Sequence, residues 1–393
     1  MTQTEKILQL SSSTGICFSE VAVVTVATRN YFHRVRALFD AVAELMPGAV
    51  RMACCPDPFE GFLTSVQEGF EIMDGRDLGV PRFDEFVFAL NPTALCCALK
   101  PFAVLRALER EGIKSVLYID NDMGLYGSPD ELLDLLKERS FVLTPHHLAP
   151  LPTGSDPDEM TLAPYGTYNA GIFGVRKVEE ALRFLEWWAG WMADPRHLPL
   201  DWAYDQIWLN YVPVYCRDAC IFYGAGYNVA FWNYQERQLQ EKNGDFFCGR
   251  DPLVLYHFSN FDDQNPERIV MPSLSCRIKQ TRTLTMLGKK IAALWQAKGR
   301  DECQGWGYGY RVWPGGDEVL DWQRELVREN WDELKLKADS SEKRTRAEVV
   351  EGLYRFCCGL GEGRVKGRIR STRSALLDLS LRKIWARLRR CCA

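Results

Sequence analysis

Residues 116–123 read Val-Leu-Tyr-Ile-Asp-Asn-Asp-Met, an apolar run that ends on two aspartates one residue apart. The run is typical of a buried strand. Because side chains at i and i+2 of an extended chain point to the same side, Asp120 and Asp122 are expected to converge just past the strand end. Ligands of open α/β sheets bind at that edge. Two converging carboxylates repel each other unless a cation lies between them, so the stretch predicts Mn²⁺ or Mg²⁺ carrying a diphosphate.

A D-x-D pair after a strand can also be a solvated turn or a helix start, so its meaning depends on the elements around it. Strands are expected at residues 21–26, 50–54, 116–119, 141–144, 171–175 and 253–258. Pro101 is expected to begin one helix and Ser128 to cap another, with Glu131 at the capping-box position. Helices are thus expected at residues 35–45, 101–112, 128–139 and 177–192. The alternation predicts a doubly wound, mixed α/β sheet.

The composition is that of an ordinary globular protein. Of the 393 residues, 47% are hydrophobic and 25% are charged, and the net charge of −4 gives no sign of a nucleic-acid partner. The 14 cysteines include four adjacent pairs and no C-x-x-C spacing, so we expect reduced, packed thiols in a reducing compartment. Since we recognise neither a signal peptide nor an apolar run of about 18 residues, we expect a cytoplasmic protein without a transmembrane helix.

The C-terminal third differs in character from the rest of the chain. We expect a catalytic domain over residues 18–265, a mostly helical extension over 266–340 that includes a helix near 277–298, and a basic helical tail over 341–393. One helical face of the tail carries four apolar residues: Leu377, Leu381, Ile384 and Leu388. Such a basic amphipathic helix either lies peripherally on an anionic membrane surface or docks on its own core with a solvated basic face.

Four further segments accompany the acidic pair. They are Ala27-Thr28-Arg29-Asn30-Tyr31, Tyr168-Asn169-Ala170-Gly171-Ile172, Tyr204-Asp205-Gln206-Ile207-Trp208-Leu209-Asn210 and Tyr256-His257-Phe258-Ser259-Asn260-Phe261. In this order, the segments and the D-x-D pair resemble the GT-A fold glycosyltransferases, most closely the retaining family 8 galactosyl- and glucosyltransferases. Members of that family show a base-contacting loop after the first strand, then D-x-D, F-N-x-G, D-Q-x-x-L-N and H-F-x-G segments. The resemblance covers about residues 21–261.

The resemblance implies a role for each matched residue around the diphosphate. Asp120 and Asp122 would hold the metal ion against the diphosphate of the donor, and Asn121 between them would also contact the donor. His257 would complete the protein's share of the coordination, since a neutral imidazole suits a mixed oxygen and nitrogen site. Lys100, ahead of the metal-binding strand, would offset phosphate charge.

The resemblance also implies roles at the two ends of the donor. The nucleoside base would be held by three residues of the first loop: Ala27, Asn30 and Tyr31. Asn169 would contact the donor sugar or the acceptor, and Asp205 and Gln206 would lie beside the sugar, on the face away from the leaving diphosphate. These three are the predicted catalytic residues. Three more residues are either acceptor contacts or structural: His146, Trp232 and Asn233.

The segment after His257 departs from the family pattern. Family members usually follow the histidine with Gly and then with a Lys that grips the diphosphate. Residues 259–266 have Asn260 where the Gly is expected and contain no Lys. Binding of the diphosphate is then expected to depend on Lys100 or Arg29.

The predicted activity is transfer of a sugar from a nucleotide-diphospho-sugar, UDP-linked as the resemblance implies, to a glycan, lipid-linked or protein acceptor. Retention is favoured, because the leaving phosphate can accept the acceptor's proton, whereas inversion would need a base such as Asp205. Two other hypotheses stay open. A phosphatase of the haloacid dehalogenase type also places D-x-D after a strand. In those enzymes the strand is the first one, whereas here the acidic pair follows a later strand. A non-catalytic nucleotide-sugar-binding protein would share the fold.

Overall fold

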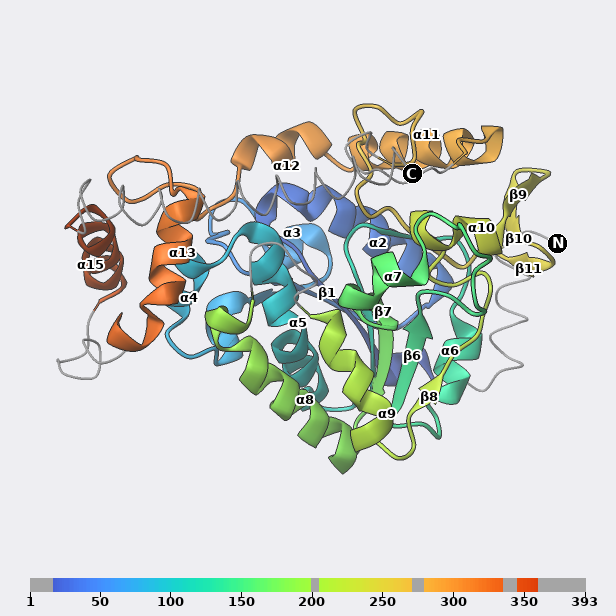
Figure 1. The fold of residues 1–393 in the computed structure, drawn as a ribbon, viewed down its shortest axis with the longest axis horizontal. Helices are drawn as coiled ribbons and strands as arrows, with labels where there is room; N and C mark the ends of the chain where they lie inside the picture. The colour runs from blue at the N-terminus through green and yellow to red at the C-terminus, as the bar shows by residue number, and fades with distance from the viewer. Residues whose placement is uncertain (1–16, 199–204, 271–278, 335–344, 360–393) are drawn as a thin grey trace, which may run out of the picture. The chain divides into compact units, whose positions relative to one another are not determined.

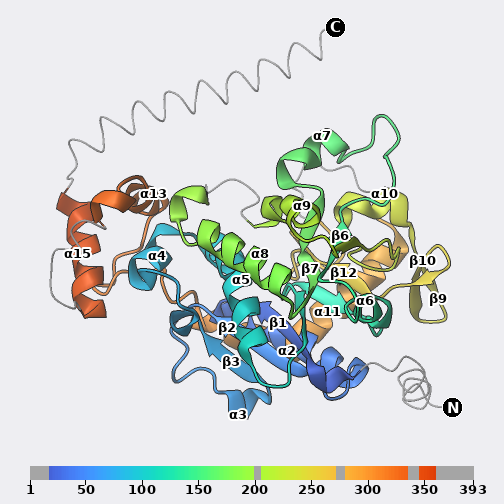
Figure 2. The ribbon, with the colours of Figure 1, turned by 90° about the horizontal axis from the view of Figure 1, so that it is seen from below.

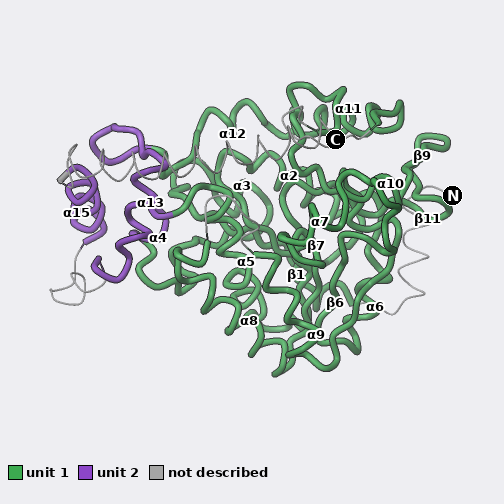
Figure 3. The backbone as a smooth tube through the Cα atoms, viewed as in Figure 1, with its two compact units in different colours: residues 1–83, 90–311 green, residues 84–89, 312–393 purple. Residues whose placement is uncertain are grey.

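The computed structural model describes the chain except for five segments: residues 1–16, 199–204, 271–278, 335–344 and 360–393 (Figure 1). Residues 1–83 and 90–311 form unit 1, and residues 84–89 and 312–393 form unit 2 (Figure 3). The domain boundaries expected after residues 265 and 340 remain predictions. The apolar face of the basic tail, residues 377–388, lies outside the described residues.

A seven-stranded mixed sheet forms the centre of unit 1 (Figures 1 and 2). Its strands, in spatial order, are β3 (Glu71–Asp74), β2 (Val50–Cys55), β1 (Val21–Val26), β4 (Ser115–Ile119), β7 (Tyr168–Arg176), β6 (Phe141–Pro145) and β8 (Cys220–Ile221). The strands β3, β2, β1 and β4 are parallel, whereas β7 runs antiparallel to β4 and β6. The carboxyl ends of β1 and β4 therefore lie beside the amino end of β7.

Helices cover both faces of the sheet, which confirms the predicted doubly wound α/β fold. On one face, α5 (Pro92–Glu109) packs on β1 and on α8 (Glu179–Met192). On the other face, α2 (Phe32–Leu45) and α6 (Asp130–Leu135) share a buried apolar cluster with Leu117 and Ile119 of β4. Because side chains alternate along a strand, Tyr118 points to the face of α5 and α8.

A short antiparallel ribbon, β5 (Met123–Leu125) with β12 (Leu255–His257), follows the end of β4. A separate small sheet contains β9 (Leu239–Lys242), β10 (Asp245–Cys248) and β11 (Asp251–Pro252). The helices α11 (Arg282–Ala297) and α12 (Arg300–Trp306) pack on α2. The shorter helical segments of unit 1 are η1 (Phe18–Glu20), η2 (Arg29–Tyr31), α3 (Ser65–Glu68), η3 (Gly75–Leu78), α7 (Glu159–Leu162), η4 (Ala163–Tyr165), η5 (Pro195–His197), η6 (Gln206–Tyr211), α9 (Val212–Tyr215), η7 (Phe231–Asn233) and α10 (Tyr234–Arg237).

Unit 2 is helical among its described residues. Its helices are α13 (Asp321–Glu329), α15 (Arg346–Gly359) and α4 (Phe83–Ala89), of which all but the first residue belong to the unit. The rings of Phe88 and Trp313 stack with centroids 4.8 Å apart, and the Trp313 indole N–H donates to Gln323 Oε1 at 3.1 Å. The predicted site residues all lie in unit 1.

The prediction that Pro101 begins a helix is wrong, because Pro101 lies inside α5. The helix begins at Pro92, and the Asn91 side chain caps it by accepting the Ala94 N–H at 2.8 Å. An Asn cap followed by Pro in the first turn is a strong start signal. It adds more than two turns ahead of Pro101, and Lys100 consequently sits within the helix.

Other predicted boundaries also shift. Ser128 does not cap α6; its hydroxyl donates to the Asp130 carboxylate at 2.5 Å, and the helix ends at Leu135. The Asp-Gln segment lies at the start of the 3-10 helix η6, which Asp205 caps, and the helix predicted near 277–298 spans Arg282–Ala297 as α11. In the part of the chain that the structure describes, no helix is long and apolar enough to cross a membrane, and the cysteines are free thiols.

Candidate active site

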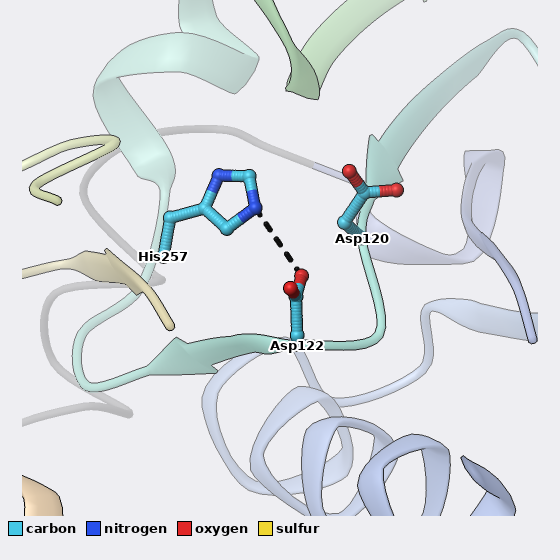
Figure 4. A group of neighbouring side chains, drawn as sticks. All are labelled: Asp120, Asp122 and His257. Atoms are coloured by element: carbon cyan, nitrogen blue, oxygen red, sulfur yellow. Dashed lines mark ion pairs between the residues drawn. The ribbon is translucent and has the colours of Figure 1, made fainter. Parts of the chain in front are cut away.

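The acidic pair and His257 meet because of one strand register (Figure 4). The β5–β12 ribbon pairs His257 with Met123, and the Phe258 N–H donates to the Asp122 carbonyl at 2.9 Å. His257 Nε2 lies 3.2 Å from Asp122 Oδ1. One ligand atom from each of Asp120, Asp122 and His257 lies within 4.8 Å of the others. Two carboxylates and an imidazole fit Mn²⁺, and they fit Mg²⁺ when the donor adds further oxygen ligands.

Asp120 is fixed by its neighbours in the sheet. Its N–H donates to the Gly171 carbonyl at 2.7 Å, because β7 pairs with β4. The Tyr118 hydroxyl donates to Asp120 Oδ1 at 2.8 Å. Burial, and then the charge of Asp120, raises the pKa of Tyr118 well above its ordinary value, so the hydroxyl remains a donor. Sequence reasoning missed Tyr118, although its i, i+2 spacing to Asp120 was a usable signal.

Asp120, Asp122 and His257 form the metal-binding group, and Lys100 joins this group to Asp205. Its side chain is 5% exposed, and its ammonium lies 2.9 Å from Asp120 and 2.7 Å from Asp205 Oδ2. It also donates to the Ala170 carbonyl at 3.1 Å. Burial would lower the pKa of Lys100, but the charges of Asp120 and Asp205 raise it well above its ordinary value. These contacts engage the three donors of the ammonium. Phosphate binding by Lys100 stays a prediction.

Charges within the group determine which of its members are protonated. Burial raises the pKa of Asp120 above its ordinary value, although Lys100 opposes this rise. Burial would also raise the pKa of Asp122, but His257, followed by Arg34 and Lys100, lowers it to about 2. Burial would lower the pKa of His257, whereas the Asp122 carboxylate raises it. A metal ion bound here would therefore displace the proton that His257 shares with Asp122.

Asn169, Gln206 and His146 form a polar chain beside the metal-binding group. The Asn169 amide donates to Gln206 Oε1 at 3.1 Å and lies 3.3 Å from His146 Nε2. His146 Nδ1 lies 3.2 Å from the Thr167 carbonyl, and burial lowers the pKa of His146 to about 4. A neutral imidazole with its proton on Nδ1 accounts for both contacts. Asp205 joins the chain because its Oδ1 accepts the Gln206 N–H at 2.9 Å.

Gly171 provides the space for the imidazole. A Cβ atom at this position would lie 2.5 Å from His257 Cε1 and 2.6 Å from Asn169 Oδ1. The Gly171 N–H donates to Asn169 Oδ1 at 2.9 Å, and its carbonyl accepts from Asp120. On the opposite side, the Trp232 ring packs edge-on against the imidazole, with centroids 5.1 Å apart. The glycine of the Asn-Ala-Gly segment thus positions three site residues.

Gly171→Ala should lower the affinity for Mn²⁺ by about 10–100-fold, because the added methyl group displaces His257. It should also destabilise the fold by about 1–3 kcal/mol. Titration calorimetry with Mn²⁺ and urea unfolding measure the two effects. Gly190→Ala on α8 is the matched control, since its added Cβ meets nothing within 4 Å. Equal Mn²⁺ affinity of Gly171→Ala and the wild type would show that the imidazole does not need this space.

The residues predicted to hold the nucleoside base follow β1. The Asn121 amide donates to the Val26 carbonyl at 2.8 Å, which joins the D-x-D turn to the start of this loop. Ala27 is buried and Tyr31 is half-buried. Asn30 Oδ1 is buried and has no hydrogen-bond partner among the described residues, so it can accept a hydrogen bond from a ligand. Base binding by these residues stays a prediction.

Arg29, the other cation expected to serve the diphosphate, has structural partners. Its guanidinium donates to the carbonyls of Pro58 at 2.7 Å, Trp306 at 2.9 Å and Gly307 at 3.0 Å. It also lies 4.3 Å from the centroid of the Phe62 ring. These contacts connect the loop after β2 to the end of α12, which gives Arg29 a role within the fold.

The sequence leaves open whether Asn233 contacts the acceptor or is structural. In the structure, both the nitrogen and the oxygen of its side-chain amide form hydrogen bonds within the fold. It is fully buried, and its Nδ2 donates to the His146 carbonyl at 3.0 Å and to the Asn228 carbonyl at 2.9 Å. Its Oδ1 accepts the Ala230 N–H at 2.9 Å. Asn233 therefore holds the segment that carries Trp232 against His146.

No protein-family model matches the chain. The chain is 22% identical over 174 residues to the Uncharacterized protein YfnD of Bacillus subtilis (strain 168), a match that covers 42% of this chain and 53% of that protein. The chain thus spans about half the length of this curated relative.

The solved structures to which the chain is similar are glycosyltransferases. Mouse xyloside xylosyltransferase 1 in its apo form is 11% identical with a TM-score of 0.38, over 60% of this chain and 97% of that one. The galactosyltransferase LgtC, in complex with donor and acceptor sugar analogs, is 14% identical with a TM-score of 0.40, over 70% of this chain and 99% of that one. The glycosyltransferase GlyE in Streptococcus pneumoniae TIGR4 is 12% identical with a TM-score of 0.41, over 72% of this chain and 62% of that one.

Proposed function

We propose that this chain is a metal-dependent glycosyltransferase that uses a nucleotide-diphospho-sugar, with UDP as its nucleotide. The observation that carries the proposal is the grouping of Asp120, Asp122 and His257 within 4.8 Å, just past the end of β4. Bound there, Mn²⁺ or Mg²⁺ would act as a Lewis acid for the diphosphate. Asn169 and Gln206 lie beside this group and would contact the donor where its sugar joins the diphosphate.

The proposed reaction breaks the bond between the anomeric carbon and the phosphate oxygen, and the electron pair stays on the diphosphate. The acceptor oxygen bonds to the same carbon, and its proton passes to the leaving phosphate. Asp205 would be the candidate base for an inverting reaction, but it is 4% exposed and paired with Lys100 at 2.7 Å. Its Oδ1 accepts the Gln206 N–H and its Oδ2 contacts Lys100, so neither oxygen is free to approach the acceptor's hydroxyl. This pairing favours retention.

The neighbouring side chains would position the sugar and stabilise charge. Asn169 donates to Gln206 Oε1 and so orients the Gln206 amide, whose N–H groups can bind a sugar hydroxyl without reorganisation. Lys100 places a buried positive charge between Asp205 and Asp120 and so offsets the repulsion between the two carboxylates. At the nucleoside end, Asn30 Oδ1, which has no hydrogen-bond partner among the described residues, would accept an N–H of the base.

The proposal is tested by incubating the chain with a panel of nucleotide sugars and Mn²⁺ and by measuring the release of free nucleoside diphosphate. We expect slow hydrolysis of at least one UDP-sugar without an acceptor, and loss of this hydrolysis in EDTA. UDP with Mn²⁺ should also raise the melting temperature, because a ligand that binds only the folded state stabilises it.

The two other hypotheses predict different results. Release of inorganic phosphate from simple phosphomonoesters, without a nucleotide requirement, would favour the phosphatase. Binding of UDP with Mn²⁺ but no hydrolysis of any nucleotide sugar would favour the binding protein. No nucleotide binding in the presence of Mn²⁺ would contradict both the transferase and the binding protein.

The acceptor class is proposed more broadly as a glycan, a lipid-linked molecule or a protein. A lipid-linked acceptor would suit peripheral association of the basic tail with an anionic membrane. Sedimentation of the full chain with phosphatidylserine vesicles, compared with phosphatidylcholine vesicles, tests that association.

A further inference from the structure

We infer that Arg34 binds the diphosphate of the donor, an inference that rests on the proposed function and adds a residue outside the recognised motifs. Arg34 lies in the first turn of α2, a helix of 14 residues that directly follows the loop proposed to hold the base. The start of a helix favours anions, because its first N–H groups lack partners within the helix and the helix dipole is positive there.

Arg34 is held by aromatic rings, not by a carboxylate. Its guanidinium carbon lies 4.6 Å from the centroid of the Tyr31 ring and 4.3 Å from that of Trp295. Among the described residues no carboxylate forms an ion pair with Arg34, and its buried Nε has no hydrogen-bond partner. Cation–π contacts orient a guanidinium and leave its N–H groups available to a ligand.

A chain of contacts links Arg34 to the segment beside Asp122. The rings of Trp295 and Phe258 lie with centroids 5.8 Å apart, and the Phe258 N–H donates to the Asp122 carbonyl at 2.9 Å. The ring that supports Arg34 is therefore in contact with the segment that follows the metal-binding histidine.

The other cations near the site have partners. Lys100 is shared by two carboxylates and a carbonyl. Arg29 donates to three backbone carbonyls. Arg36, on the next turn of α2, pairs with Glu68 at 2.7 Å. Of these three arginines, Arg34 is the one whose guanidinium has neither a hydrogen bond nor an ion pair with a described residue.

Charge balance shows why a further cation is needed. Asp120, Asp122 and Asp205 carry three negative charges, and Lys100 with a divalent metal ion carries three positive charges. The diphosphate of a nucleotide sugar then adds about two negative charges, which this set of groups does not offset. A guanidinium offers a planar fork of N–H groups that matches two phosphate oxygens, so Arg34 would reduce this excess and orient the diphosphate.

The inference also gives α11 a function. Trp295 belongs to α11 and is 1% exposed, and α11 follows the part of the chain that carries the motif resemblance. By holding the guanidinium of Arg34, this helix would contribute indirectly to donor binding.

Arg34→Gln tests the inference when UDP binding and uridine binding are compared in the presence of Mn²⁺. Calorimetry should show UDP affinity falling by about 10–100-fold, the usual effect of losing charged hydrogen bonds. Ligand-observed NMR should show uridine affinity unchanged within about twofold, because uridine has no phosphate. Arg34→Lys, which keeps the charge without the fork, should recover part of the UDP affinity. Arg183→Gln removes an exposed ion pair with Glu179 on α8 and is the control that should bind UDP as the wild type does.

Equal UDP affinity of Arg34→Gln and the wild type, or a matching loss of uridine affinity, would overturn the inference and leave the proposed function standing. If the wild type binds no UDP in the presence of Mn²⁺, the proposed function and the inference both fail. Should Arg34→Gln not fold, Arg34→Lys decides: it must bind UDP more weakly than the wild type while its uridine affinity is unchanged.

Discussion

Asp122→Asn should lower metal-dependent turnover of the sugar nucleotide on the order of 100-fold or more. The substitution keeps the size of the side chain and removes one of the two carboxylate charges that hold the metal ion. It also removes the anionic partner of His257 Nε2, which lies 3.2 Å from Asp122 Oδ1. An amide oxygen is a weaker ligand for a hard divalent cation than a carboxylate oxygen, so the metal ion and the diphosphate lose affinity together.

Initial rates of UDP-sugar hydrolysis at several Mn²⁺ concentrations measure this effect, and the melting temperature with and without UDP and Mn²⁺ provides a second readout. Asp134→Asn is the control: it makes the same change on α6, where Asp134 forms an ion pair with Lys137 at 2.7 Å and its side chain is 45% exposed. Undiminished turnover in Asp122→Asn would contradict the assignment of the metal site.

The central sheet was predictable because its strands are continuous apolar runs. β1 is buried at all of its positions, and so is β4, whose run ends at the acidic pair. The convergence of Asp120 and Asp122 also followed from alternation along an extended chain. His257 was identified only through the resemblance, since its place depends on the antiparallel register of β5 and β12, which neither short strand encodes alone.

The partners of these residues were not predictable from local patterns. The contact of Lys100 with Asp205 depends on how α5 is rotated against the sheet and on where η6 begins. A helix that begins at Pro101, as predicted, would exclude Lys100, whereas Lys100 lies within α5. Arg34 lies just ahead of the helix predicted over residues 35–45, and its contact with Trp295 requires α11 to pack on α2. Contacts between elements that lie far apart in the sequence depend on tertiary packing, which the periodicity of apolar residues does not reveal.

Lys100→Met should destabilise the fold by about 3–5 kcal/mol, because it leaves two buried carboxylates without their shared cation. Methionine fills a similar volume, so the loss reflects charge more than packing. Asp120 and Asp205 would then repel each other. Urea unfolding measures the loss, and a fall in Mn²⁺ affinity should accompany it, since the metal-binding carboxylate of Asp120 loses the ammonium that holds it in place.

A double-mutant cycle separates this electrostatic effect from a general loss of packing. Asp205→Asn removes one of the two carboxylates, so Lys100→Met should cost less free energy of unfolding in that background than in the wild type. Lys114→Met is the matched control, because Lys114 pairs with Glu20 at 2.6 Å and its side chain is 71% exposed, where an ion pair contributes at most about 1 kcal/mol. If Lys100→Met costs the same in both backgrounds, its buried charge is not coupled to Asp205, and the link from the metal-binding group to the predicted catalytic carboxylate is lost.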